Sequence, residues 1–233
     1  MLACPACATP IEQGSHVCSG CGLFVRIEGG RATPVYPDVR PGAVLASHDL
    51  VRTRPPGMNR GTRTLENGVR VSEVAEGLAL ELPGGQAFRS GISLVRRRDV
   101  CVRANFVASD PSVRFSLVAR CELMGKATTH YSLIFDMGKL LVRLERVIAS
   151  PKITIATPLT EWRPAAGLLP VGQPNDVELR AFGATLEGLV SGRRVLVFHD
   201  PVLGVGYPGI RVEAIGAAGR CLWRGLEIRE VAS

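Results

Sequence analysis

The chain has 233 residues, enough for one large domain and a small one, and its 46% hydrophobic content can form a sizeable core. No stretch approaches the ~18 uninterrupted apolar residues of a membrane-spanning helix, and no apolar secretory stretch follows Met1. We therefore expect a cytoplasmic protein without a membrane span.

The net charge of +7 comes from 25 Arg and only 3 Lys. The densest basic run is Arg96, Arg97 and Arg98. A positive surface can bind a polyanion, but basic and aromatic residues do not alternate here as they do in proteins that bind single strands. We expect a solvated arginine surface and regard nucleic-acid binding as the weakest interpretation.

The first predicted element is a metal site in residues 1–25. Cys4 and Cys7 form one C-x-x-C pair, and Cys18 and Cys21 form a second one ten residues later. Two such pairs surround a tetrahedral Zn²⁺ with four thiolates and leave no open position, so the ion is expected to be structural. His16 is an alternative ligand, which four thiolates make unnecessary.

This segment, CPACATPIEQGSHVCSGCGL at residues 4–23, resembles the short bacterial zinc-ribbon family. The resemblance implies that the four cysteines are the ligands and that the ribbon is an adaptor. The family pattern has glycine directly after the second cysteine of each pair. Here Ala8 follows the first pair and Gly22 follows the second. A protein partner for the ribbon, within a larger assembly, is the expectation that follows.

Residues 26–76 are rich in Gly, Pro and Arg and show no helical periodicity. They predict a linker that packs in part on the next domain. Within it, residues 43–51 have the composition of a helical turn.

From residue 77 to residue 233, short runs of alternating apolar and polar residues are separated by Gly, Asp or Pro. This pattern predicts antiparallel strands in a sandwich or barrel. The predicted strands are residues 77–82, 100–107, 113–121, 131–135, 139–147, 177–182, 185–190, 195–198, 210–214 and 222–228.

The order of these runs resembles the concanavalin A-like lectin and glucanase superfamily, including laminin-G-like modules. The resemblance is carried by residues 175–180, by the turns at 183–185 and 188–192, and by residues 206–210. It implies a jelly-roll β-sandwich and does not fix a function.

A catalytic site is not evident from the motifs. Glucanases of this fold carry a Glu-x-Asp-x-x-Glu pattern on one strand, and the sequence lacks it. If the protein were a glycoside hydrolase, its paired carboxylates would have to come from loops, with Asp136, Glu161 and Asp176 as candidates.

Two kinds of ligand site were also considered. Asp110 and Asp136 are candidate rim ligands for Ca²⁺, but the dense acidic cluster that Ca²⁺ needs is missing, so we do not expect calcium. Tyr131, Trp162 and Tyr207 are candidate aromatic platforms for a sugar, and each is equally suited to a core.

Our first interpretation is a non-enzymatic binding or scaffolding protein. The zinc ribbon would dock a partner, and the sandwich would recognise a protein or a glycan. The alternative is a carbohydrate-active enzyme of glycoside hydrolase type on the same sandwich.

Overall fold

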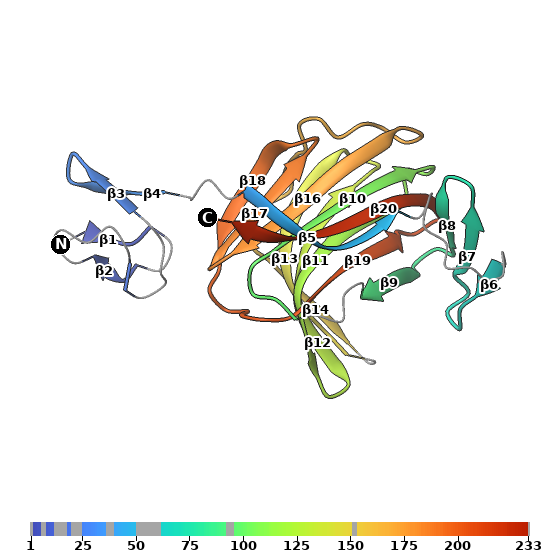
Figure 1. The fold of residues 1–233 in the computed structure, drawn as a ribbon, viewed down its shortest axis with the longest axis horizontal. Coiled ribbons are helices and arrows are strands. Elements are labelled where there is room, and N and C mark those ends of the chain that lie inside the picture. Colours follow the sequence, from blue (N-terminus) through green and yellow to red (C-terminus); the bar gives the residue numbers. More distant parts are fainter. Residues whose placement is uncertain are drawn as a thin grey trace.

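The structure is a computed structural model that describes residues 2–5, 8–11, 18–19, 25–35, 40–49, 62–91, 96–150 and 153–232. Within these ranges the chain is all β, and every strand pairing is antiparallel. Two sheets form a β-sandwich, and two short strand pairs near the N-terminus stand beside it (Figure 1). The predicted antiparallel β-sandwich is confirmed.

The larger sheet has nine strands within the described ranges. One edge of this sheet is formed by short strands that follow residue 61 in the sequence. Its order is β18 (Arg193–His199), β17 (Thr185–Val190), β16 (Pro174–Phe182), β10 (Val100–Ala108), β20 (Gly219–Ala232), β8 (Gly77–Leu82), β7 (Arg70–Val74) and β6 (Thr62–Thr64), and β5 (Arg40–Asp49) also pairs with β20.

The smaller sheet has seven strands in the same part of the chain. Its central strands follow one another in sequence, so they form a meander. The order is β14 (Thr154–Pro158), β13 (Leu141–Ala149), β12 (Ala127–Asp136), β11 (Val113–Met124), β19 (Tyr207–Ala214) and β9 (Ala87–Gly91), with β15 (Arg163–Pro164) paired to β13.

The core lies between the two sheets. Val102, Ala104 and Phe106 of β10 alternate along the strand and are fully buried in the core cluster. The ring of Phe106 stacks on Phe115 of β11, with centroids 4.0 Å apart and planes at 4°. Because successive side chains of a strand point to opposite faces, the residues between them lie on the outer faces of the sandwich.

The β17–β18 connection shows how local sequence sets the register. Ser191 and Gly192 form a two-residue turn with φ of 49° and 75°. Positive φ at both positions gives a turn whose twist matches that of the flanking strands, and glycine adopts it without strain. The turn predicted in this segment therefore sets β17 directly beside β18.

The segment 26–76, predicted as a linker partly packed on the sandwich, supplies β5, β6 and β7 to the larger sheet. The helical turn predicted at residues 43–51 is wrong, because residues 40–49 form β5 and pair with β20. Strand pairing outweighs the weak helix propensity of this stretch. None of the described residues forms a helix long and apolar enough to cross a membrane.

Near the N-terminus, β1 (Leu2–Ala3) pairs with β2 (Pro10–Ile11), and β3 (Val25–Glu28) pairs with β4 (Arg31–Pro34).

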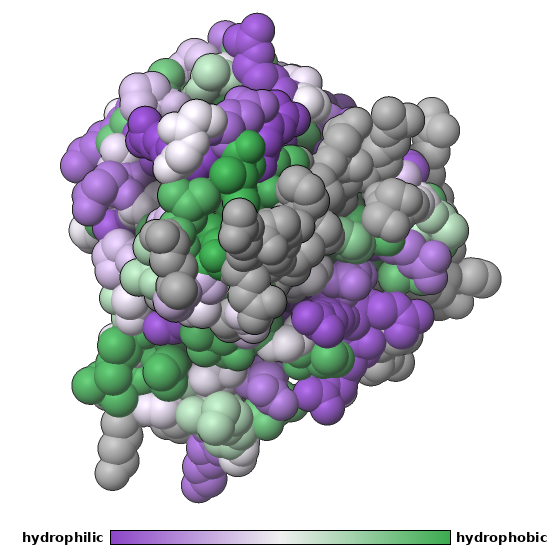
Figure 2. Space-filling model, turned by 90° about the vertical axis from the view of Figure 1, so that its left-hand side faces the viewer, coloured by the Kyte–Doolittle hydropathy of each residue, from purple (hydrophilic) through white to green (hydrophobic). Residues whose placement is uncertain are grey.

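Figure 2 shows the side of the molecule that lies at the left of Figure 1. Hydrophobic residues form separate patches there, between polar and charged ones.

Candidate functional site

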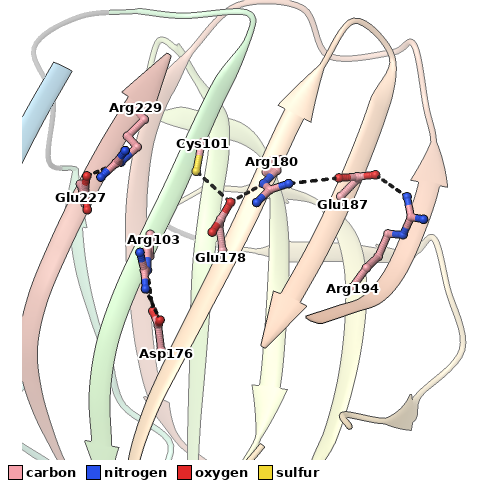
Figure 3. A network of polar contacts seen from close by, with 9 residues as sticks. All are labelled: Cys101, Arg103, Asp176, Glu178, Arg180, Glu187, Arg194, Glu227 and Arg229. Carbon is pink, nitrogen blue, oxygen red and sulfur yellow. Dashed lines mark hydrogen bonds and ion pairs between the residues drawn. The ribbon is translucent and has the colours of Figure 1, made fainter. Parts of the chain in front are cut away.

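Charged side chains of both signs line the outer face of the larger sheet (Figure 3). They alternate with core residues along neighbouring strands, so the charged groups at the ends of these side chains lie next to one another on the outer face. We call this set the carboxylate–arginine network. Its members are Cys101, Arg103, Asp176, Glu178, Arg180, Glu187, Arg194, Glu227 and Arg229.

The centre of the network is a guanidinium between two carboxylates. Arg180 Nε donates to Glu178 Oε1, and Arg180 Nη1 lies 4.0 Å from Glu187 Oε2. Arg194 Nη1 donates to Glu187 Oε1 at 2.9 Å. Glu178 is 7% exposed and Glu187 3% exposed, so both carboxylates are withdrawn from bulk water.

The strand register fixes how far apart these two glutamates are. Glu178 of β16 lies opposite Leu189 of β17, two residues from Glu187. Such diagonal neighbours on one face are about 7–8 Å apart. The two carboxyl groups are held apart by the guanidinium of Arg180, which contacts both of them.

Further ion pairs lie on the β10 and β20 side of this centre (Figure 3). Arg103 Nε donates to Asp176 Oδ1 at 2.8 Å, and Arg229 Nε donates to Glu227 Oε1. They fix the orientation of side chains on β10, β16 and β20.

The Cys101 thiol belongs to the same network and donates to Glu178 Oε1 at 3.2 Å. Burial, followed by the charge of Glu178, raises the pKa of the Cys101 thiol far above its usual range. A thiol in this state is a poor nucleophile at neutral pH. Cys101 therefore acts as a hydrogen-bond donor to the carboxylate.

The outer face of the smaller sheet carries a second polar group of residues. His130 and Ser132 of β12 lie on it, with Arg143 of β13 and Arg211 of β19, because each alternates with core residues of its strand. We call these four residues the histidine–arginine face. His130 is 6% exposed and Ser132 is fully buried.

The three predicted aromatic platforms are placed differently. Tyr131 is fully buried in the core, and its hydroxyl donates to the Asp200 carbonyl at 3.1 Å and accepts from Leu203 N–H at 3.0 Å. Its ring offers no face to a ligand, which corrects its assignment as a ligand-face residue. Trp162 and Tyr207 are half-buried.

The loop carboxylates proposed for a hydrolase do not come together as a pair. Asp136 ends β12 in the smaller sheet, where Arg114 Nε donates to its Oδ2 at 3.0 Å. Asp176 lies on β16 in the larger sheet, beside Glu178 in the network. Because packed sheets are about 10 Å apart, Asp136 and Asp176 cannot share one glycosidic bond. Glu161 is exposed in the loop before β15.

Asp110, a candidate calcium ligand, accepts a hydrogen bond from Arg220 N–H at 2.9 Å through Oδ2. It lines a hollow of about 540 Å³ together with Arg70, Glu81 and Arg220. Across the described ranges, no three His, Cys, Asp or Glu side chains are grouped so as to hold a metal ion.

Two of the four predicted zinc ligands, Cys4 and Cys18, are described and lie buried in one small cluster with Ile11 and Val25. Ala8 N–H donates to the Cys4 carbonyl at 2.9 Å, and Ala8 has a φ of 59°.

The remaining zinc candidates, Cys7, Cys21 and His16, lie outside the described residues.

Comparison with known proteins finds the same fold in solved structures. The carbohydrate-binding module CBM66 from Bacillus subtilis matches with a TM-score of 0.52 and 14% identity, over 74% of this chain and 92% of that chain. A Bacillus licheniformis β-glucanase matches with a TM-score of 0.52 and 9% identity, over 78% and 96%. A prokaryotic β-1,3-1,4-glucanase (lichenase) from a mouse hindgut metagenome matches with a TM-score of 0.50 and 10% identity, over 79% and 98%.

No protein-family model matches the chain, and no curated protein matches it in sequence. At these identities the structural likeness shows the fold, a jelly-roll β-sandwich of the concanavalin-like kind.

The comparison also corrects our first interpretation. The reading of the sandwich as a purely non-enzymatic scaffold is contradicted by structural neighbours that are glucanases. Of the carboxylates in the network, Asp176 was a candidate from the sequence, whereas Glu178 and Glu187 were missed. Their signal was present in the alternation Asp176, Glu178, Arg180 on one face of a predicted strand.

Proposed function

We propose that the sandwich is a carbohydrate-active protein of glycoside hydrolase type. One observation carries this proposal: Glu178 and Glu187 are two buried carboxylates that flank a single guanidinium, at the diagonal spacing of neighbouring strands. Hydrolysis of a glycosidic bond is the reaction for which two carboxyl groups suffice, so the substrate class is a polysaccharide.

We infer an inverting reaction, because the guanidinium of Arg180 lies between the two carboxyl groups and leaves them separated. One carboxylate takes a proton from a water molecule as its oxygen attacks the anomeric carbon, and the other carboxylic acid donates a proton to the leaving oxygen as the glycosidic bond breaks. We assign these two roles to Glu178 and Glu187, whose carboxyl groups both contact Arg180.

The test is hydrolysis of a panel of neutral glucans, galactans and fructans by the full chain, with the anomeric configuration of the first product followed by NMR. We expect inversion. Glu178→Gln and Glu187→Gln should each lower kcat by at least about a hundredfold, which is the lower end of what a positioned acid or base contributes.

The matched control is Glu81→Gln, because Glu81 forms an exposed ion pair with Arg70 on β7 and β8, away from the network. It should leave turnover unchanged. Hydrolysis that survives in both Glu178→Gln and Glu187→Gln, or no hydrolysis of any glycan in the panel, contradicts the proposal.

For the N-terminal unit we propose a structural Zn²⁺ held by Cys4, Cys7, Cys18 and Cys21. Support comes from the common burial of Cys4 and Cys18. A bound ion would supply most of the folding free energy of a unit this small. Metal analysis of the purified chain should find one zinc, and replacing Cys4 and Cys18 with serine should abolish it.

A further inference from the structure

Exposed aliphatic side chains gather at one end of the smaller sheet, where the β11–β12 and β13–β14 hairpins extend below the rest of the sandwich (Figure 1). Figure 2 also shows hydrophobic residues at this lower end. We call this set the apolar tip. Its members are Leu123, Met124, Ile148, Ile153 and Ile155. Single exposed aliphatic residues are common on folded proteins, whereas a group of them on neighbouring strands marks an interaction surface.

The strand register brings the members of the apolar tip together. Met124 lies opposite Ala127 at the end of the β11–β12 hairpin. Ile148 of β13 lies between two strands, opposite Ile155 of β14 on one side and opposite Thr129 of β12 on the other. The two hairpins are therefore adjacent, and their ends form one continuous projection.

Both faces of the β11–β12 hairpin are apolar at its end. Leu123 is 65% exposed and Met124 is 60% exposed. Because successive side chains of a strand point to opposite faces, these two neighbours are exposed on opposite sides of the hairpin. A flat protein surface, including one on a second copy of this chain, covers only one of them. A lipid bilayer that the hairpin enters surrounds its end and covers both.

The charge around the apolar tip is positive. Lys126 is exposed in the turn of the β11–β12 hairpin, and Arg96 and Arg98 are also exposed. Glu122, a carboxylate near the end of β11, pairs with Arg96 at 3.0 Å. Among the described residues, Lys126 and Arg98 have no ion-pair partner. The surplus positive charge attracts an anionic surface and repels a second copy of the same tip.

The basic run 96–98 is held close behind the apolar tip. The backbone of Arg97 pairs with that of Gly206, and Arg96 contacts Glu122. A strand rises about 3.3 Å per residue, so Glu122 lies about 7 Å behind Met124. The Debye length at physiological ionic strength is about 8 Å. Charges at this depth are therefore still attracted to an anionic surface that the tip enters.

We propose that the apolar tip inserts into the interfacial region of an anionic lipid bilayer, with Lys126 and the basic run 96–98 attracted to its headgroups. A lipid surface fits better than a protein, because exposed aliphatic residues lie on both sides of the hairpin and the surrounding charge is positive. This inference goes beyond glycan hydrolysis and does not depend on it.

The experiment is sedimentation of the full chain with lipid vesicles. One set of vesicles is phosphatidylcholine alone, and the other is an equimolar mixture of phosphatidylcholine and phosphatidylglycerol. We expect at least about tenfold tighter binding to the mixed vesicles, because each basic residue near the surface adds attraction. Added salt should weaken this binding, because it screens the charges.

The aliphatic side chains are tested by threonine substitutions, which keep a residue suited to a strand. Leu123→Thr combined with Met124→Thr should weaken binding to the mixed vesicles at least about tenfold, because apolar area no longer enters the bilayer. Ile153→Thr should weaken it about threefold. The matched control is Ile215→Thr, because Ile215 is exposed directly after β19, at the other end of the smaller sheet. It should bind as the original chain does.

The charge is tested at the two ends of one strand. Lys126 directly precedes β12 and Lys139 follows it, and both are exposed. Lys126→Gln should weaken binding to the mixed vesicles about fivefold, whereas Lys139→Gln should leave it unchanged. Circular dichroism of each variant establishes that it is folded.

Insertion is followed by fluorescence of Leu123→Trp and Met124→Trp, each compared with the original chain, whose tryptophans are Trp162 and Trp223. The emission of both added indoles should shift to the blue when the mixed vesicles are present, because both enter an apolar environment. A shift in only one of the two variants would indicate docking through one face and would refute insertion.

The proposal is overturned if the chain does not sediment with the mixed vesicles, or if it binds both kinds of vesicle equally. It is also overturned if Leu123→Thr with Met124→Thr, when folded, binds as the original chain does, since the net charge of +7 would then account for the binding. A dimer in analytical ultracentrifugation that this variant dissociates, without vesicle binding, would assign the tip to a second copy and refute a lipid surface.

Discussion

Replacing Arg120 with methionine should destabilise the sandwich more than any surface change, because Arg120 is a fully buried cation at a β-bulge of β11. Its guanidinium donates to the carbonyl of Arg98 at 2.8 Å, to that of Leu203 at 2.9 Å and to that of Gly183. Arg120 Nη2 also lies 3.7 Å from Asp99 Oδ1. The hydrogen bonds of this one side chain therefore link three separate connecting segments to the end of the smaller sheet.

The magnitude follows from these contacts. A hydrogen bond to a charged group contributes about 1.5–3 kcal/mol, and three are lost together in Arg120→Met. Movement of the three connections and entry of water recover part of this loss. Breaking a buried charged arrangement from one side costs about 3–5 kcal/mol, which is the decrease in the free energy of unfolding that we expect.

Urea denaturation followed by tryptophan fluorescence measures this decrease. Arg120→Lys, which keeps the charge but not the forked geometry, should lie between the original chain and Arg120→Met. Arg70→Met removes an exposed ion pair with Glu81 and should change the free energy of unfolding by at most about 0.5 kcal/mol. A loss of less than about 1 kcal/mol in Arg120→Met would show that the three carbonyls find other partners, and would refute this reasoning.

Three further predictions concern single residues. The pKa of His130 is lowered from 6.5 to about 4 in the folded protein. The contribution of His130 to stability should therefore be constant above pH 6.5 and fall by about 3 kcal/mol as the pH drops towards 4. His130→Asn should flatten that pH dependence in urea titrations. Ala8→Gly should relieve the cost of a φ of 59° and so strengthen zinc binding by about 0.5–1 kcal/mol, as measured by competition with a chelator. Burial raises the pKa of the Cys221 thiol, so Cys221 should resist alkylation in the native chain at pH 8 and react only on unfolding, as read by mass spectrometry.

The strands that alternate cleanly were predictable. The predicted bounds 77–82 and 185–190 agree with β8 and β17, because one side of each strand packs into the core while turn residues end it. Strands β5, β7 and β9 were missed. β5 begins with Arg40, Pro41 and Gly42, a sequence typical of a loop, and becomes a strand by pairing with β20. Pairing partners distant in sequence are not readable from local pattern.

The candidate site shows the same limit. That Glu178 and Arg180 share one face follows from alternation on a single strand. That Glu187 of β17 joins them depends on the register between β16 and β17, which the turn at Gly183 fixes and which single-strand patterns do not contain. The zinc ion, a protein partner for the N-terminal unit and a cytoplasmic location stay predictions.

Glu178 and Glu187 contact the same guanidinium, and this geometry predicts how their variants combine. Residues that share a partner in one network are coupled, so the effects of their substitutions do not add.

Glu178→Gln combined with Glu187→Gln should therefore lower kcat little more than either substitution alone. Kinetics on a soluble oligosaccharide with the original chain, the two single variants and the double variant measure this coupling. If the two single losses multiplied in the double variant, the glutamates would act independently, and their assignment to one reaction would be wrong.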